Sequence, residues 1–152
     1  MRHHILTIGR MRRGPFFDLQ AEYAGRLVPA PAITELEEKR PLPEAALKAR
    51  EAALIVAAIP DGARVVALDP RGQSWSSRDL AAHLRDWADR GTGTVAFAIG
   101  GAAGLAEPVL ARADTTLSLG SMTWPHFLAR IMLLEQLYRA QQILAGHPYH
   151  RE

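Results

Sequence analysis

The stretch Thr94-Val95-Ala96-Phe97-Ala98-Ile99, followed directly by Gly100-Gly101, decides the fold class of this 152-residue chain. Its side chains are apolar at almost every successive position, so both faces of the strand that they form must be buried. The run from Arg64 to Leu68 has the same character. Strands buried on both faces belong to parallel sheets that helices cover on each side. We therefore expect an α/β fold with a mainly parallel sheet.

Strands and helices are expected to alternate along the whole chain. Short apolar runs ended by Gly or Pro predict strands at 4–8, 32–37, 64–68, 94–99 and 115–119. Apolar residues at helical spacing, or runs of good helix formers, predict helices at 15–27, 44–58, 76–90, 105–113 and 125–144. No linker or repeat divides the chain, so residues 1–152 are expected to form a single domain. His3 and His4 are expected to face solvent or the sheet edge.

The composition is that of a globular protein, with 48% apolar and 22% charged residues. The absence of cysteine excludes a disulfide framework and any thiolate metal site. No stretch approaches the roughly 18 apolar residues that would span a bilayer. We expect a cytoplasmic protein without a membrane partner. All basic residues except Lys39 and Lys48 are arginines, which suits RNA but is equally typical of a genome rich in G and C.

Ligands of parallel α/β sheets bind outside the carboxyl ends of the strands, and three loops qualify: 69–74, 100–104 and 119–126. The glycine-rich loop at 100–104 lacks the spacing of a Walker or Rossmann phosphate loop. It is either a ligand-binding loop or merely a tight turn between strand and helix. The loop at 119–126 is apolar with small residues at its centre. It could hold a flat heterocycle through main-chain hydrogen bonds, with Met122 and Trp124 covering it, or be buried under the last helix.

The C-terminal segment Gly146-His147-Pro148-Tyr149-His150-Arg151-Glu152 is the most distinctive part of the chain. After Gly146 caps the last helix, a short tail dense in His, Tyr and Arg remains, and such groups can stack on bases and bind phosphate or carbonyl oxygens. The alternative is a frayed, solubilising terminus. His147 and His150 have no acidic or Cys partner nearby, so we expect no metal site.

The three loops and the tail, in this order, resemble the large-subunit ribosomal RNA methyltransferase H family, which consists of small SPOUT-class enzymes. The matching segments in the C-terminal two thirds are 66–69, Ile99-Gly100-Gly101, Gly104-Leu105, Ser118-Leu119, Met122-Thr123, Pro125-His126, Arg130, 135–140 and 147–151. Glu22-Tyr23, Arg26 and the Lys39-Arg40 pair extend the resemblance into the N-terminal half. It covers essentially the whole chain.

The resemblance implies a SPOUT fold with a C-terminal trefoil knot, a homodimer, and S-adenosylmethionine bound in the knot. It implies methylation at N3 of a pseudouridine in the bridging hairpin of large-subunit (23S) rRNA, on assembled ribosomes. Carried over by position, the cofactor contacts fall at Leu68, Gly100, Leu119, Gly120, Ser121, Met122, Thr123 and Trp124.

The expected catalytic residues are His126 and the tail residues Tyr149, His150 and Arg151. N3 must lose a proton before it attacks, and His126 or His150 is a candidate to take it. Arg151 would stabilise the resulting anion through the flanking carbonyl oxygens, and Tyr149 would stack on the base. We expect the tail to cross to the partner's cofactor. Two alternatives stay open: a knotted methyltransferase for another RNA nucleotide, and a non-catalytic module that binds S-adenosylmethionine and RNA.

Overall fold

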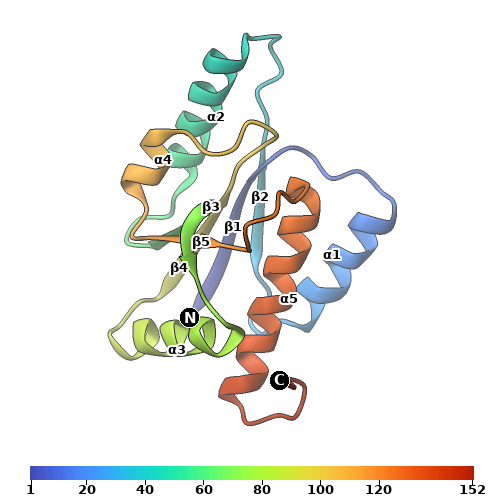
Figure 1. The fold of residues 1–152 in the computed structure, drawn as a ribbon, viewed down its shortest axis with the longest axis vertical. Coiled ribbons are helices and arrows are strands. Elements are labelled where there is room, and N and C mark those ends of the chain that lie inside the picture. Colours follow the sequence, from blue (N-terminus) through green and yellow to red (C-terminus); the bar gives the residue numbers. More distant parts are fainter.

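The computed structural model describes residues 1–152, which form one five-stranded sheet with helices on both faces (Figure 1). All neighbouring strands are parallel and follow the order β2-β1-β4-β3-β5. This confirms the predicted α/β fold with a parallel sheet. The strands are β1 (Arg2–Ile8), β2 (Ala32–Leu36), β3 (Arg64–Ser74), β4 (Thr94–Ile99) and β5 (Thr115–Ser118).

Each predicted helix is present, within a few residues at its ends. The helices are α1 (Pro15–Arg26), α2 (Glu44–Ala58), α3 (Ser77–Asp89), α4 (Glu107–Arg112) and α5 (His126–Leu144). The start of α3 is fixed by a capping box, in which Ser76 and Asp79 satisfy each other's backbone N–H groups. Pro125 precedes α5 as its N-cap, one position before the helix begins. None of these helices has the length and apolar character that a membrane span requires.

Successive residues of the central strands supply two separate cores. Ile5, Val66 and Phe97 pack against α3 and α5 on one face, where α1 also lies. Leu6 and Val65 point to the other face and pack against α2 and α4. This alternation explains why the central strands are apolar at consecutive positions, because each strand faces a helical layer on both sides.

The segment 69–74 was predicted to be a loop, and this is wrong. β3 continues through it after an irregularity, and Gln73 and Ser74 pair again with Leu117 and Ser118 of β5. The two segments approach so closely at Gly72 that a Cβ there would lie 2.6 Å from the backbone carbonyl carbon of Thr116. Only glycine permits such an approach, and local sequence patterns do not reveal it. The trefoil knot stays a prediction.

The placement predicted for His3 is also wrong. Its side chain is buried beside Phe97 of the neighbouring strand, with ring centroids 6.0 Å apart. Burial, with a smaller contribution from the N-terminal ammonium group, lowers the pKa of His3 to about 4. His4 does lie toward the sheet edge, where its Nε2 is 2.7 Å from Thr34 Oγ1 on β2.

Candidate functional site

A cavity of about 290 Å³ lies at the carboxyl ends of β4 and β5, beside the irregularity in the middle of β3, and we call it the strand-end pocket. Three segments wall it: the middle of β3, the glycine-rich loop after β4, and the loop between β5 and α5. Together with Ala129 of α5, its lining comprises Leu68–Pro70, Ile99–Gly104, Leu119, Gly120, Met122, Thr123, Trp124 and His126. The sheet topology thus brings the three predicted ligand-binding segments to one place.

Seven of the eight predicted cofactor residues line this pocket, and Ser121 does not. Met122 and Trp124 are 72% and 40% exposed, so a flat ligand beneath them would cover apolar surface that now faces solvent. The indole Nε1 of Trp124 donates to the Leu119 carbonyl oxygen at 3.3 Å, and Ser118 Oγ accepts from the Gly120 N–H at 3.1 Å. These hydrogen bonds fix the loop between β5 and α5, and they leave its other main-chain N–H and C=O groups free to bind a ligand.

Gly100 has a structural reason to lack a side chain. A Cβ at this position would lie 2.6 Å from the carbonyl carbon of Gly104, because the glycine-rich loop folds back on itself there. The loop is closed by the Gly104 N–H, which donates to the Gly101 carbonyl oxygen at 3.0 Å. The loop is thus a tight turn, and it also walls a pocket; its binding of a ligand stays a prediction.

His126 lies at the junction between the strand-end pocket and the end of β1. A Cβ on Gly9 would be 3.2 Å from His126 Nε2, so the imidazole lies against the backbone after β1. Partial burial, and secondly the positive charge of Arg130, lower the pKa of His126 below its usual value. Both effects favour the neutral imidazole, which is the form that can accept a proton.

A larger groove of about 640 Å³ runs between α1, α3 and α5, and we call it the helix groove. Tyr23, Trp75 and Glu135 are among its lining residues. Leu119 and Gly120 line both the helix groove and the strand-end pocket. One short segment of main chain thus separates the two spaces.

The C-terminal tail is folded onto the second half of α5. Tyr149 Oη donates to Glu135 Oε1 at 3.1 Å, and Arg139 Nε donates to the same oxygen at 3.0 Å. The Arg139 guanidinium also lies 3.2 Å from His150 Nδ1. Partial burial, and secondly the hydrogen bond to Glu135, raise the pKa of Tyr149. The tail is consequently an ordered element that several contacts hold, as opposed to a frayed end.

The predicted catalytic residues do not all meet within one chain. His126 lines the strand-end pocket, whereas Tyr149, His150 and Arg151 do not. The tail leaves the opposite end of α5, as Figure 1 shows, and Arg151 is exposed. A pocket completed by this tail would need a second copy of the chain.

Sequence reasoning gave no role to Arg130, the largest fully buried side chain. Its guanidinium donates to Glu35 Oε2 at 2.8 Å, Gln20 Oε1 at 3.0 Å, the Gly9 carbonyl oxygen at 3.1 Å and Thr7 Oγ1 at 3.2 Å. It thereby ties α5 to β1, α1 and β2. Two signals were available: Arg130 is one of the positions that match the family, and it is a charged residue at an apolar position of a helix.

The family model of predicted SPOUT methyltransferases matches residues 1–150. The ribosomal RNA large subunit methyltransferase H of Paramagnetospirillum magneticum is 54% identical over 151 residues, with 99% of each chain covered. The protein of the same name from Rhodospirillum centenum is 52% identical over 151 residues, again with 99% of each chain covered.

Solved structures share the fold at low sequence identity. A methylase family protein from Haemophilus influenzae superposes with a TM-score of 0.62 at 14% identity, over 99% of this chain and 70% of that one. A methyltransferase from Legionella pneumophila, in complex with S-adenosylmethionine, gives a TM-score of 0.52 at 17% identity, over 92% and 66% of the two chains. With its near-complete match to the family model and to these relatives, the chain belongs to the SPOUT methyltransferase family, in the group of the large-subunit ribosomal RNA methyltransferases H.

Proposed function

We propose that this protein transfers the methyl group of S-adenosylmethionine to N3 of a pseudouridine in the bridging hairpin of large-subunit rRNA. It would act as a homodimer of single-domain chains, on assembled ribosomes in the cytoplasm. The observation that carries the proposal is the strand-end pocket, which two loops of the expected type enclose and which has His126 at its edge.

The residues of the strand-end pocket fit an adenosyl group. Its walls are mostly glycine, alanine and apolar side chains, so main-chain N–H and C=O groups of 100–104 and 119–124 are the available hydrogen-bonding partners. Leu68 and Ile99 supply apolar surface for a flat ring, and Met122 and Trp124 can cover it. S-adenosylmethionine bound here supplies an electrophilic methyl group on a sulfonium.

Within this reaction His126 is the proposed acceptor of the N3 proton. The N3 proton must leave, because the electron pair of the neutral imide nitrogen is delocalised into the flanking carbonyls and only the anion would have a pair free to take up the methyl group. The neutral imidazole of His126 is suited to this, because burial and Arg130 disfavour its charged form. His150, bound to Arg139, is the alternative proton acceptor.

The tail is the proposed binding element for the acceptor base, acting on the cofactor of the partner. Arg151 is exposed and forms no ion pair within its own chain, so it is available to stabilise negative charge on the carbonyl oxygens beside N3. Tyr149 offers an aromatic face for stacking, while Glu135 and Arg139 orient the tail.

Methyl transfer from labelled S-adenosylmethionine to ribosomes that lack the modification tests the proposal, with mapping of the labelled nucleotide. We expect label at a pseudouridine of the bridging hairpin. Label at another nucleotide would contradict the proposed target nucleotide, while the proposed reaction, methyl transfer from S-adenosylmethionine, would stand. No label, with S-adenosylmethionine binding still measurable by calorimetry, would favour the non-catalytic module.

A further inference from the structure

The connection between β1 and α1 carries a dense cluster of exposed cations. Arg10, Arg12 and Arg13 fall within four consecutive positions, and Lys39 joins them from the segment after β2. We call these four residues the basic patch. They border a surface hollow of about 630 Å³, in which Glu37 is the only carboxylate. Four cations against one carboxylate leave the hollow with a net charge of +3.

The four residues of the basic patch form no ion pairs within the chain. Nine of the chain's arginines form ion pairs, including the neighbouring Arg40, which is bound to Glu38. None of the four patch residues does so. The charges therefore stay available to an external anion.

The loop that carries these arginines is fixed by contacts to the interior of the protein. Between Arg10 and Arg12, the side chain of Met11 is buried, and the Met11 N–H donates to Glu35 Oε2 at 2.7 Å. Glu35 is in turn held by the buried Arg130. An ordered loop loses less conformational entropy on binding than a mobile one, so its cations bind an anion more effectively.

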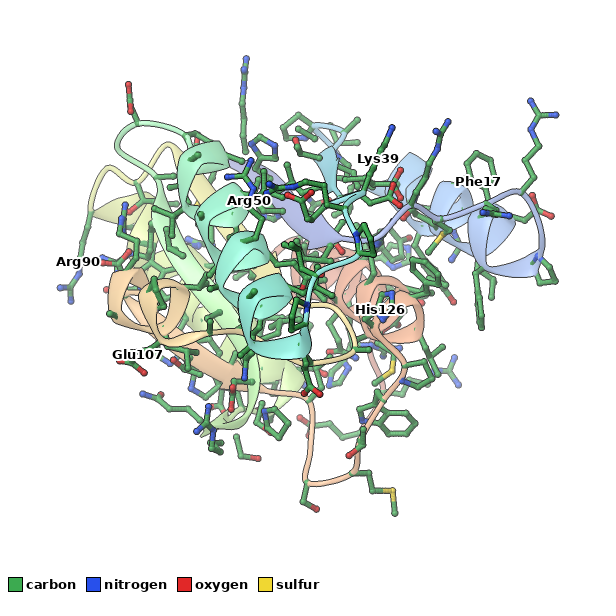
Figure 2. The ribbon with its side chains drawn as sticks, turned by 90° about the horizontal axis from the view of Figure 1, so that it is seen from above. Phe17, Lys39, Arg50, Arg90, Glu107 and His126 are labelled. Atoms are coloured by element: carbon green, nitrogen blue, oxygen red, sulfur yellow. The ribbon has the colours of Figure 1, made fainter.

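The basic patch lies next to the proposed reaction site. It begins one residue after Gly9, against which His126 packs, and Phe127 lines a second hollow together with Arg10, Arg12 and Arg13. Figure 2 shows Phe17, Lys39 and His126 on one side of the molecule, with Arg90 and Glu107 on the other. A polyanion held on the patch would thus pass close to the methyl donor.

We propose that the basic patch binds backbone phosphates of the substrate RNA beside the target nucleotide. The inference rests on the proposed function for its choice of polyanion. Arginine suits this task because its planar guanidinium binds two phosphate oxygens at once. The exposed rings of Phe16 and Phe17, at the start of α1, offer surfaces on which an unpaired base can stack.

The test compares two double variants with the same change in net charge. Arg12→Gln/Arg13→Gln removes two patch cations. The control, Arg2→Gln/Arg85→Gln, removes two exposed cations outside the patch, on β1 and α3, that also form no ion pair. For each protein, kcat/KM for methyl transfer to ribosomes is measured at several salt concentrations, with S-adenosylmethionine affinity as a check on folding. Each lost phosphate contact should reduce the slope of log(kcat/KM) against log[salt] by about 0.7–0.9.

We expect the patch variant to lose about 1.5 units of slope and to raise KM at least tenfold, while the control variant matches the wild type. An equal effect of both variants would mean that net charge matters and the patch does not. An unchanged slope in the patch variant would also overturn the inference.

Failure of the proposed function can be distinguished from failure of this inference by a second measurement. If the wild-type protein transfers no methyl group to ribosomes, equilibrium binding of the same three proteins to assembled ribosomes tests the patch alone. A loss of affinity in the patch variant alone would then support RNA binding by the basic patch, although the proposed methyl transfer had failed. Equal affinities would contradict it.

Discussion

Arg130 of α5, which has no exposed surface, donates a hydrogen bond to Glu35 of β2 over 2.8 Å. The side chain of Glu35 is itself 31% exposed. This pair joins the second turn of the last helix to the edge strand, and it fixes the loop that precedes α1, because Glu35 also accepts from the Met11 N–H.

Replacement of Glu35 by alanine should destabilise the fold, because it leaves the buried guanidinium without its counter-ion. We expect a loss of about 2–4 kcal/mol in the free energy of unfolding, below the full cost for a completely buried pair since Glu35 is partly exposed. Urea denaturation measures it. Glu37→Ala, one residue beyond β2 and exposed, is the matched control and should stay within about 0.5 kcal/mol of the wild type. Equal losses for the two variants would contradict the role of the ion pair.

Filling the strand-end pocket from α5 should prevent cofactor binding. Ala129→Leu adds three carbons to a pocket wall without changing the glycine-rich loop. We expect the Kd for S-adenosylmethionine to rise at least tenfold, by about 1.4 kcal/mol or more. Calorimetry measures it, with Ala129→Ser as the control of nearly unchanged volume. Gly100→Val would be a poorer test, since its side chain would first collide with Gly104. Undiminished affinity in the leucine variant would place the cofactor elsewhere.

The lowered pKa of His126 makes a prediction about the acid side of the pH–rate profile. A base works in its neutral form, and a pKa below the usual value of 6.5 keeps that form dominant at pH 7. We expect kcat to be flat near neutrality and to fall only below pH 6.5, as the imidazole gains a proton. His126→Asn should lower kcat by about 10²–10⁴ and remove this acid limb. A variant that retains the wild-type profile would exclude His126 as the base and direct attention to His150.

Arg151→Ala should abolish turnover while leaving S-adenosylmethionine affinity unchanged, because Arg151 lies outside the strand-end pocket. If the tail acts on the partner's cofactor, mixed dimers of Arg151→Ala with Ala129→Leu regain activity. In each mixed dimer, one pocket is intact and faces the intact tail of the other chain. We expect about a quarter of wild-type activity from random mixing. Mixed dimers that stay inactive would indicate a tail that serves its own chain.

The predictable part of the fold is what local patterns determine. The apolar runs at 64–68 and 94–99 disclosed strands buried on both faces, and the cores on either side of the sheet confirm this. The helix predicted at 76–90 is α3, and its start lies where Ser76 and Asp79 form the capping box. The position of the strand-end pocket could also be predicted from the sequence, because the loops that follow parallel strands lie together at one edge of the sheet.

The unpredicted part depends on residues that are distant in sequence. The continuation of β3 beyond Leu68 depends on its contact with β5 at Gly72. His3 is buried because β1 occupies an interior position of the sheet, which its own sequence does not reveal. The partners of Arg130 lie between 95 and 123 residues away from it along the chain, so no local pattern could identify them.

The close approaches at Gly72 and Gly100 have a consequence for how the chain tolerates change. At both positions main-chain atoms lie within 2.7 Å of where a methyl group would have to go. Neither neighbour is the movable end of a side chain. In a saturation library these two positions should reject even alanine, whereas Gly25 and Gly93, which face open space, should accept it. Much of the loss of function on mutation around the strand-end pocket would then come from main-chain segments that lie too close for a side chain. Such losses would not identify residues that bind the cofactor or take part in the reaction.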